Sequence, residues 1–477
     1  MTARRTFSLP EQLGFARLSG DWNPLHIDPV AARRTIFEAP VVHGIHLLMW
    51  ALDRWLADRA AVSITALKVV FRKRLLLDTE VALEILDDPD ASPGSRVRLV
   101  GTAAGDAVLE ATIGFTTSEP APPCPELAPA GFTEVPRFVA REAIAALHGR
   151  TPLALDTGAA TAGFPHAMRA LGALVVAELL ALTRIVGMEC PGLHSVFGGL
   201  ELQRCAEPGP LAIDWRVTNA NLKYSVVGLA AHGARFEGKL ATFYRPAPQD
   251  GPTVEQVSSA VRPGEFAGQR ALVVGGSRGL GEAIVRCLAA GGADVCFTYH
   301  RGAADADRII SDTAGAAGRI VATALDVTAT TDAAPGQVID LRWPFDAAPT
   351  HLYYLATPRM PTVARFVRAD LDHMLRFYVD GLFAVTASAC QLGAPIDVWV
   401  PSTRMLSDGD GSAAYCMAKA AMEELCRRLP KMMPVRVHTP RLPRIATDQT
   451  AGLTQLPAAS ALDVALPELR AVAAIGH

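Results

Sequence analysis

The sequence has little that would suit a disulfide framework, a structural metal or a nucleic acid partner. Its 8 cysteines include no CxxC pair, which argues against a zinc site and a disulfide-stapled fold and favours reduced core thiols. Lysine and arginine number 45 against 48 aspartates and glutamates, so no broad positive field is available to hold a phosphate backbone. We therefore expect no metal site and no nucleic acid partner.

Long apolar runs are also missing. The basic start of the chain is not followed by the roughly 7–15 apolar residues of a secretory signal. The most apolar stretch, 171–187, is interrupted by Glu178 and Arg184. It falls short of the about 20 apolar residues that cross a bilayer, which favours a buried helix. The expectation is a cytoplasmic protein with no transmembrane segment and no membrane partner.

The sequence is rich in apolar residues. Hydrophobic residues make up 50% of the chain and charged residues 19%, a composition typical of folded globular domains. Its 477 residues suffice for about three domains. Two stretches rich in proline, glycine, serine and alanine, 118–131 and 245–265, are typical of linkers and separate three blocks, 1–117, 132–245 and 266–477.

The first two blocks share one order of predicted elements. In each, a long apolar helix, at 41–57 or 170–187, precedes a series of strand-like runs separated by turns. Any two antiparallel sheets packed on a helix would look alike at this level, which is the alternative interpretation. We predict a duplication.

Two acid–base side chains lie close together in the string SGDWNPLH. Asp21 and His26 are five positions apart, and the Asn23-Pro24 step between them disfavours a continuous helix, so both side chains can turn into one pocket. A carboxylate and an imidazole that share a water can polarise it and return a proton to carbon. In the later string VVHG, Gly44 opens the apolar helix, whose free first amides can bind a carbonyl oxygen as it gains negative charge. This set predicts hydration or dehydration next to a thioester.

The strings SGDWNPLH and VVHG together resemble the signature of the MaoC-like (R)-specific enoyl-thioester hydratases, which have the hot-dog fold. In that family the aspartate and histidine carry the chemistry, and the amide of the glycine binds the thioester carbonyl. The resemblance covers about residues 8–116 and implies these roles for Asp21, His26 and Gly44.

The second block has no Asp-x-x-x-x-His motif, and its nearest polar pair, His166 and Arg169, is interpreted as structural or substrate-lining. Hot-dog domains usually pair, and a duplicated chain can make that pair internally. The resemblance therefore implies an α+β double hot-dog domain with one hydratase site, in which the second block supplies a partner surface and part of the acyl pocket.

From residue 266 the pattern changes to strand, glycine turn, helix and strand, the opening of a βαβ unit. Gly275, Gly279 and Gly281 allow a tight turn and a close backbone approach, so a pyrophosphate can rest against the following helix N-terminus. Ser277 and Arg278 lie within the same turn and are further candidates for contacts with the cofactor.

A second set of chemical groups lies near the C-terminus. Tyr415 and Lys419 are four apart on a predicted helix and share one face, and Ser402 ends a strand 13 positions before the tyrosine. An ammonium beside a phenol favours the phenolate, and a serine hydroxyl can orient a substrate oxygen. This set predicts a site of carbonyl reduction, with hydride going to carbon and a proton to oxygen.

A glycine turn, a serine and Tyr-x-x-x-Lys in this order resemble the short-chain dehydrogenase/reductases, especially their 3-oxoacyl-thioester reductases, over about residues 266–450. The resemblance implies an α/β Rossmann-type doubly wound parallel sheet that binds a nicotinamide dinucleotide. Arg278, and Arg301 in a 298–301 segment without an acidic residue, favour a 2′-phosphate and hence NADPH over NADH. Asp326 matches the family residue that contacts adenine.

The chain departs from that family at four places. Val274 replaces the threonine before the first glycine, and Tyr354–Thr357 replaces an Asn-Asn-Ala-Gly segment. Tyr378 stands where an asparagine normally supports a water relay to the lysine, although a shifted alignment would offer Asp380. Arg441 replaces the glycine of the Pro-Gly pair after the sixth strand. Contacts with adenine and the proton relay are therefore expected to differ.

The two resemblances predict a bifunctional (R)-3-hydroxyacyl-thioester dehydratase or enoyl hydratase and NADPH-dependent 3-oxoacyl-thioester reductase, in fatty-acid or polyketide-like metabolism. Each domain makes the other's substrate, carried on CoA or acyl-carrier protein. The alternative is an active hydratase with a catalytically silent reductase-like scaffold. A module that only binds acyl thioesters is disfavoured by the complete side-chain sets. Reductases of this family associate through helices beside the Tyr-Lys helix, which implies at least a homodimer through residues 266–477.

Overall fold

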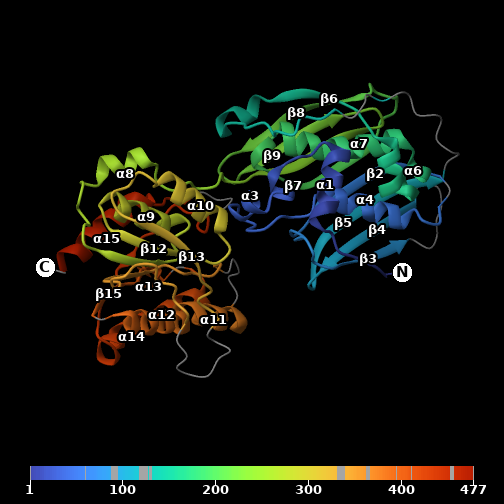
Figure 1. The fold of residues 1–477 in the computed structure, drawn as a ribbon. Coiled ribbons are helices and arrows are strands. Elements are labelled where there is room, and N and C mark those ends of the chain that lie inside the picture. Colours follow the sequence, from blue (N-terminus) through green and yellow to red (C-terminus); the bar gives the residue numbers. More distant parts are fainter. Residues whose placement is uncertain are drawn as a thin grey trace. The chain divides into compact units, whose positions relative to one another are not determined.

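The computed structural model describes residues 2–59, 61–87, 95–117, 127, 131–329, 339–360, 366–393, 395–409, 411–451 and 456–475. The chain divides into two compact units, Met1–Ala247 and Pro248–Ala451 with Leu456–His477, which we call the N-terminal and C-terminal units (Figure 1). Most of the first predicted linker, 118–131, lies outside the described residues.

The N-terminal unit contains one order of elements twice. Its first half consists of β1 (Thr2–Arg5), α1 (Leu9–Ser19), α2 (Pro24–Ile27), α3 (Pro29–Arg33), α4 (Gly44–Trp55), β2 (Val62–Phe71), β3 (Val81–Asp87), β4 (Ser95–Ala103) and β5 (Asp106–Thr117). Its second half consists of η1 (Arg141–Ala146), β6 (His148–Pro152), α5 (Thr157–Gly163), α6 (Pro165–Leu171), α7 (Ala173–Arg184), η2 (Ile185–Glu189), η3 (Gly192–His194), β7 (Ser195–Arg204), β8 (Ala212–Asn221), β9 (Val226–His232) and β10 (Phe236–Tyr244).

The strands of this unit form one antiparallel sheet in the order β1-β3-β4-β5-β2-β7-β10-β9-β8-β6. The two halves of this order mirror each other and meet where β2 pairs with β7, from Ala66 opposite Gln203 to Val70 opposite Gly199. A methyl group on Gly199 would lie 2.4 Å from the main-chain oxygen of Val69, so the seam requires a glycine there. Two hot-dog sheets are thus joined edge to edge, and the predicted internal pairing is confirmed.

Helices α4 and α7 lie across one face of this sheet and supply much of its core (Figure 1). The apolar stretch 171–187 is a buried helix, as predicted, with Glu178 2% exposed. The buried carboxylate of Glu178 accepts hydrogen bonds from the main-chain N–H groups of Arg235 (2.9 Å) and Phe236 (3.0 Å), which compensate its lost hydration.

No single helix among the described residues has both the length and the apolarity of a membrane span. Helix α6 together with Ala173–Glu189 reaches them only as a pair bent by 118°.

The C-terminal unit is built around a parallel sheet. Its elements are α8 (Val254–Ala260), β11 (Arg270–Val274), α9 (Gly279–Ala290), β12 (Asp294–Tyr299), α10 (Ala303–Asp312), β13 (Ile320–Ala324), β14 (His351–Tyr354), α11 (Arg368–Leu375), η4 (Arg376–Gly381), α12 (Leu382–Leu392), β15 (Ile396–Trp399), β16 (Ser402–Thr403), α13 (Met405–Asp408), α14 (Ala413–Met432), β17 (Val435–His438), β18 (Arg441–Leu442) and α15 (Ala461–Ile475).

The sheet order is β13-β12-β11-β14-β15-β17, with every pair parallel, so the order reverses between β11 and β14. One hydrophobic core gathers α9, α10 and α15 on one face, and a second gathers α11, α12 and α14 on the other (Figure 1). This is the doubly wound arrangement predicted from the sequence. Ligands of such sheets bind beyond the carboxyl ends of the strands, at the point of reversal.

Helix α8 lies within the stretch 245–265, which the composition indicates as a linker. Thr253 and Gln256 form a capping box: the Thr253 hydroxyl accepts from the Gln256 N–H (3.2 Å), and the Gln256 side chain accepts from the Thr253 N–H (2.8 Å). Val257, 2% exposed, packs in the core with α9. The compact unit therefore begins near Pro248, earlier than the predicted boundary at 266.

Candidate active sites

Asp21 is held between the two halves of the N-terminal unit. It follows α1 and is 1% exposed. Its Oδ2 accepts a hydrogen bond of 2.6 Å from the hydroxyl of Thr183, on α7 of the second half. Its Oδ1 accepts the main-chain N–H of Asn23 at 3.2 Å. The carboxylate is thus oriented by its own loop and by the second half together.

Asn23 fixes this loop to the second half. Its buried side-chain amide donates to the main-chain oxygens of Gly187 (3.1 Å), Gly192 (3.2 Å) and Leu193 (3.3 Å). Its side-chain oxygen accepts the N–H of Leu25 at 3.1 Å and so caps α2. Asn23 of the SGDWNPLH string therefore fixes the start of α2, the helix that carries the His26 imidazole.

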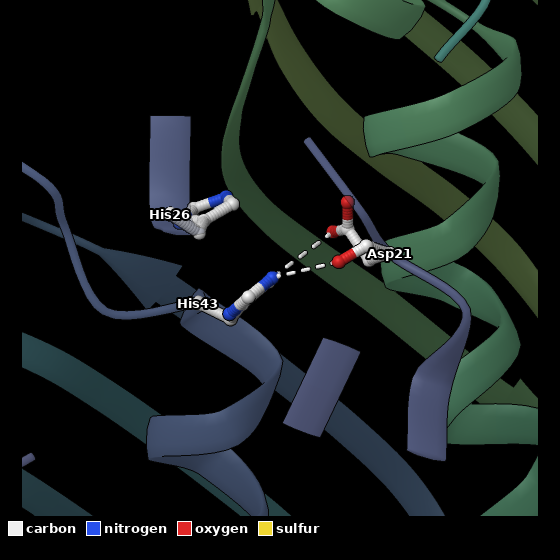
Figure 2. Close-up of side chains that lie close together, drawn as sticks. All are labelled: Asp21, His26 and His43. Atoms are coloured by element: carbon white, nitrogen blue, oxygen red, sulfur yellow. Dashed lines mark hydrogen bonds and ion pairs between the residues drawn. The ribbon is translucent and has the colours of Figure 1, made fainter. Parts of the chain in front are cut away.

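His26 lies on α2 and faces the Asp21 side of the site (Figure 2). His26, His43 and Asp21 each place one polar atom within 4.8 Å of the other two. The main-chain oxygen of Val41 lies 2.8 Å from Nδ1 of His26. Because a carbonyl only accepts, Nδ1 carries the proton of the neutral ring and Nε2 keeps a lone pair. The sequence prediction that Asp21 and His26 share one pocket is confirmed as geometry.

His43, which the sequence analysis did not assign, completes this cluster. Its Nε2 lies 3.1 Å from the main-chain oxygen of Asp21 and 4.0 Å from the carboxylate Oδ2 (Figure 2). The oxygen of Gln12 accepts both the N–H of His43 (3.1 Å) and its Nδ1–H (2.8 Å), while the Gln12 amide donates to His46 (3.1 Å). The sequence signal was present, because His43 is the histidine of the VVHG string.

The types of these three side chains would also suit a metal ion. The rings of His26 and His43, however, stack with centroids 3.9 Å apart and an interplanar angle of 24°. Parallel rings do not splay around a common ion, as tetrahedral coordination of zinc requires. The arrangement is better suited to acid–base chemistry on a water molecule.

Burial sets the charges in this pocket. It raises the pKa of Asp21 to about 6, against the hydrogen bonds from Thr183 and Asn23, which lower it. Burial also lowers the pKa of His26 to about 4, and the charge of Arg245 acts in the same direction. His26 is therefore neutral above about pH 4, and Asp21 is ionised above about pH 6. At neutral pH the site pairs a carboxylate with a neutral imidazole.

Gly44 is the first residue of α4, where main-chain amides have no partner inside the helix. A methyl group on Gly44 would lie 2.8 Å from the ring of Phe71 on β2. The absent side chain thus lets the Phe71 ring pack against the first turn of α4.

Gly187 lies directly behind Asp21, in the π-helical turn η2 of the second half. A methyl group there would lie 2.1 Å from Asp21 Oδ1, so Gly187→Ala must displace the carboxylate. We expect a loss of enoyl-thioester hydration of about tenfold or more, in a protein that keeps its circular dichroism spectrum. Gly163→Ala, in the same half but with nothing within 4 Å, is the matched control. Equal activity of the two variants would show that the second half does not position Asp21.

His166 and Arg169, the polar pair of the second block, support the end of α4. The main-chain N–H of His166 donates to Asp53 Oδ1 at 2.8 Å, and Arg169 donates to the main-chain oxygens of Leu56 (3.1 Å) and Ala57 (2.8 Å). Both contacts fit the structural interpretation.

The glycine turn of the C-terminal unit lies at the reversal point of the sheet. Gly275 has a φ of 82°, and a methyl group on it would lie 2.9 Å from the main-chain nitrogen of Ala356, which follows β14. A methyl group on Gly281 would lie 2.2 Å from the Gly275 oxygen. Gly279, with a φ of 58°, opens α9. The turn thus brings three glycines to a helix N-terminus, and their backbone fits a pyrophosphate.

The predicted cofactor side chains lie around this turn. Ser277 is partly exposed in the turn itself. The Arg278 guanidinium lies 3.8 Å from the carboxylate of Asp448. Arg301 is exposed just beyond β12, and Asp326, which accepts hydrogen bonds from the N–H (2.9 Å) and hydroxyl (2.7 Å) of Thr328, follows β13. Although burial opposes it, these bonds and the charges of His300 and Arg301 hold the pKa of Asp326 below its usual value.

Tyr415 and Lys419 lie on α14, as predicted. Burial raises the pKa of Tyr415 to about 12, and a hydrogen bond with Thr403 lowers it. Burial lowers the pKa of Lys419 to about 7. The Lys419 ammonium donates to the main-chain oxygen of Pro401 at 2.8 Å. The ammonium is therefore anchored at the end of the strand that leads into β16.

Ser402 is buried, and its hydroxyl donates to Oε1 of Glu423, on the same helix as Tyr415, at 2.6 Å. The carboxylate of Glu423 is bound in turn by Arg441, at 2.8 and 2.7 Å. The next residue of β16, Thr403, accepts the main-chain N–H of Met405 at 3.2 Å. The catalytic role of Ser402 stays a prediction.

Tyr378, in the position where related reductases carry an asparagine, lies on the π-helical turn η4. The Lys419 ammonium lies 4.1 Å from the centroid of its ring, and the Tyr378 and Tyr415 rings are 6.0 Å apart. Its hydroxyl shares a hydrogen bond with Thr357. A ring face attracts a cation but takes no proton. Tyr378 therefore holds the Lys419 ammonium, but it does not replace the water relay that an asparagine supports in related reductases.

Comparison with known proteins supports this two-part organisation. Residues 2–88 match the family model described as MaoC like domain, and residues 269–454 match that described as short chain dehydrogenase. The (R)-specific enoyl-CoA hydratase of Aeromonas caviae is 31% identical over 118 residues, which cover 22% of this chain and 87% of that protein.

Two further relatives match parts of the chain. The NADPH-dependent aldehyde reductase-like protein, chloroplastic, of Arabidopsis thaliana is 30% identical over 189 residues, covering 35% of this chain and 67% of that protein. The peroxisomal multifunctional enzyme type 2 of Mus musculus is 43% identical over 65 residues, 13% of this chain and 9% of that protein. A hydratase-type domain is thus joined to an oxidoreductase-type domain of a family that uses NAD or NADP. The chain belongs to the MaoC-like family at its N-terminus and to the short-chain dehydrogenase family at its C-terminus.

Proposed function

We propose that the chain is a bifunctional enzyme that reduces 3-oxoacyl thioesters with NADPH and interconverts the resulting (R)-3-hydroxyacyl and 2-enoyl thioesters. The observation that carries the proposal is the Asp21, His26 and His43 cluster, whose polar atoms lie within 4.8 Å of one another, in a chain that also carries Tyr415 and Lys419 on one helix. The product of each reaction is the substrate of the other, which gives the fusion a chemical reason.

In hydration, the lone pair of His26 Nε2 takes a proton from a water that the Asp21 carboxylate also binds, and the water oxygen adds to C3 of the enoyl thioester. The N–H of Gly44 stabilises the negative charge that develops on the thioester oxygen. A proton returned from the acid–base pair to C2 completes the (R)-3-hydroxyacyl product. Dehydration follows the same steps in reverse.

In ketone reduction, a bound nicotinamide would supply hydride to C3 of the 3-oxoacyl thioester. Gly275, Gly279 and Gly281 would hold the pyrophosphate, and Ser277, Arg278, Arg301 and Asp326 would contact the adenosine end. Tyr415 donates its phenolic proton to the ketone oxygen, and Lys419 stabilises the phenolate left behind. The hydroxyl of Ser402, in β16, orients the ketone oxygen.

We also propose that acyl groups arrive on CoA or acyl-carrier protein, and that the chain associates at least as a homodimer through its C-terminal unit. Met417 and Met432 on α14 are exposed at 51% and 57%, apolar surface that such a contact would cover. An enzyme whose C-terminal unit is only a scaffold is the second candidate, supported by the loss of the asparagine relay at Tyr378.

NADPH rather than NADH is the expected cofactor, because Arg278 can neutralise a 2′-phosphate. Arg278→Ala should weaken NADPH binding about tenfold and leave NADH binding nearly unchanged, measured by fluorescence titration. Asp448→Asn, which removes the charge 3.8 Å from the guanidinium, should have the opposite effect on NADPH. Equal affinity of the unaltered protein for the two cofactors, or tighter NADH, would refute the preference.

The two activities can be measured separately. Hydration is followed by the loss of enoyl-thioester absorbance from a 2-enoyl-CoA, and reduction by NADPH oxidation with a short 3-oxoacyl-CoA. Turnover in both assays supports the bifunctional enzyme. Hydration without NADPH oxidation supports the scaffold alternative, and trace turnover in both would leave a module that only binds acyl thioesters.

A further inference from the structure

Lys419 is a buried cation, and its three ammonium hydrogens meet three different kinds of group. The residue is 6% exposed. Its ammonium donates to the main-chain oxygen of Pro401 at 2.8 Å and to Sδ of Met422 at 3.6 Å. It also lies 4.1 Å from the centroid of the Tyr378 ring. A buried charge needs such contacts, because it has lost its hydration.

The carboxylate of Glu423, one turn further along α14, is committed to other partners. Arg441 binds it at 2.8 and 2.7 Å, and the Ser402 hydroxyl donates to it at 2.6 Å. Burial lowers the pKa of Lys419 to about 7, against Cys426 and Glu423, which raise it.

The remaining titratable groups around the ammonium are uncharged at neutral pH. Burial raises the pKa of Tyr415, of Tyr378 and of Cys426 above their usual values. The Tyr378 ring is therefore a principal source of attraction for the charged form of Lys419.

The position of this ring is fixed from the end of β14. The Tyr378 hydroxyl shares a hydrogen bond with the Thr357 hydroxyl. The Tyr354 hydroxyl donates to the main-chain oxygen of Phe377 at 2.6 Å. The two bonds hold successive residues of the π-helical turn η4, so the ring of Tyr378 cannot turn away from the ammonium without breaking a buried contact.

The same ring packs on the other member of the Tyr-Lys pair. It is 2% exposed and meets the Tyr415 ring edge to face, at an interplanar angle of 71°. Two of the departures from the reductase pattern are thereby joined, because side chains of the Tyr354–Thr357 segment hold the turn that carries Tyr378. They form one arrangement around Lys419.

We propose that Tyr378 is a positioning residue of the reductase site: its ring face keeps the buried Lys419 ammonium charged and holds it beside Tyr415. The proposal rests on the proposed reductase function, in which this cation stabilises the phenolate left by proton transfer. A ring face attracts the ammonium but not the neutral amine. Loss of the ring therefore lets Lys419 give up its proton at a lower pH, and Tyr378 sets the upper pH limit of ketone reduction.

The test compares Tyr378→Phe, which keeps the ring, with Tyr378→Leu, which removes it, in the full-length protein. With a 3-oxoacyl-CoA and NADPH, kcat/KM of the unaltered enzyme should fall as the pH rises through about 7, the pKa of Lys419. Tyr378→Leu should move this alkaline limb to lower pH by about one unit, and Tyr378→Phe should leave it within about 0.3 units.

The direction of the shift separates this role from a structural one. A core that is merely loosened admits water, which favours the charged amine and moves the limb to higher pH. Tyr353→Leu is the matched control, because it removes another buried ring of the same unit that packs against Trp399 in the other core. It should cost stability and leave the limb in place. An unmoved limb in Tyr378→Leu, or an equal shift in Tyr353→Leu, would overturn the proposal.

A fluorinated phenylalanine at position 378 keeps the experiment decisive if Tyr378→Leu does not fold. Fluorine atoms withdraw electrons from the ring face and leave the shape of phenylalanine nearly unchanged. The alkaline limb should again move to lower pH relative to Tyr378→Phe. Identical pH profiles for the two rings would contradict the role of the ring face.

A direct titration of Lys419 needs no turnover and so separates this proposal from the proposed function. Lys419 is the one buried lysine of the chain's 6, the others being Lys68, Lys73, Lys223, Lys239 and Lys431. In protein labelled with carbon-13 at lysine Cε, the signal that is lost in Lys419→Met should titrate near pH 7.

The midpoint of that titration should fall by about one unit in Tyr378→Leu and stay in place in Tyr378→Phe. If the titration behaves in this way while the unaltered protein reduces no 3-oxoacyl thioester, the proposed function fails and the hold of Tyr378 on the ammonium stands. A midpoint that does not depend on the ring would contradict the proposal whatever the activity.

Discussion

Replacing Asp21 by asparagine should lower hydration of a 2-enoyl-CoA by roughly two or more orders of magnitude, as loss of an acid–base group does. The substitution keeps the hydrogen bonds from Thr183 and Asn23 in reach but removes the charge that activates water. His26→Ala should cause a loss of similar size, because it removes the lone pair that accepts the water proton. Ketone reduction should persist in both variants, since it uses side chains of the C-terminal unit.

The control for Asp21→Asn is Asp28→Asn. Asp28 is an exposed aspartate that caps α3 through Val30 and Ala31, and asparagine caps a helix equally well. Its hydration rate should stay near that of the unaltered protein. Near-normal hydration in both Asp21→Asn and His26→Ala would remove these residues from the mechanism.

The pH dependence gives the same pair a second test. Asp21 must be ionised, and its pKa is about 6, so kcat/KM for hydration should fall as the pH drops through that value. His26, with a pKa of about 4, stays neutral over this range and adds no limb of its own above pH 6. Thr183→Val removes a hydrogen bond that stabilises the charged carboxylate and should move the acid limb to higher pH.

Replacing Tyr415 by phenylalanine should lower ketone reduction by roughly two to four orders of magnitude, because no other described group at the site is placed to give the ketone oxygen a proton. Hydration should be unaffected. Tyr353→Phe removes another buried phenol of the same unit, one that donates to Gln269 at 3.1 Å, and should cost stability without abolishing reduction. Full reductase activity in Tyr415→Phe would contradict the assignment of the proton donor.

The sequence predicted the parts of each site that lie close together along the chain. Asp21 and His26 share one pocket because an Asn-Pro step turns the backbone between them, and Tyr415 and Lys419 share a helix face because they are four apart. The order of apolar runs predicted a duplication in the first part of the chain and a βαβ opening in the last. The resemblances to the MaoC-like hydratases and the short-chain dehydrogenase/reductases implied the paired hot-dog halves and the doubly wound sheet.

Contacts from distant segments could not be predicted. Thr183 and Gly187 reach Asp21 from the second half, where the fold places them but no motif marks them. The network in which Ser402 donates to Glu423 and Arg441 binds Glu423 joins β16, α14 and β18, and a spacing of 13 between Ser402 and the tyrosine does not encode it. Helix α8 was missed because it is short and polar and is marked only by its capping box.

The most direct test of the bifunctional account is to incubate the full-length protein with NADPH and a short 3-oxoacyl-CoA and identify every product by mass. A bifunctional enzyme should give two products, the 3-hydroxyacyl-CoA and the 2-enoyl-CoA formed from it by loss of water. Asp21→Asn should yield the hydroxyacyl product alone, and Tyr415→Phe should yield neither. Recovery of unreacted 3-oxoacyl-CoA from the unaltered protein, with NADPH unconsumed while added 2-enoyl-CoA is still hydrated, would contradict it.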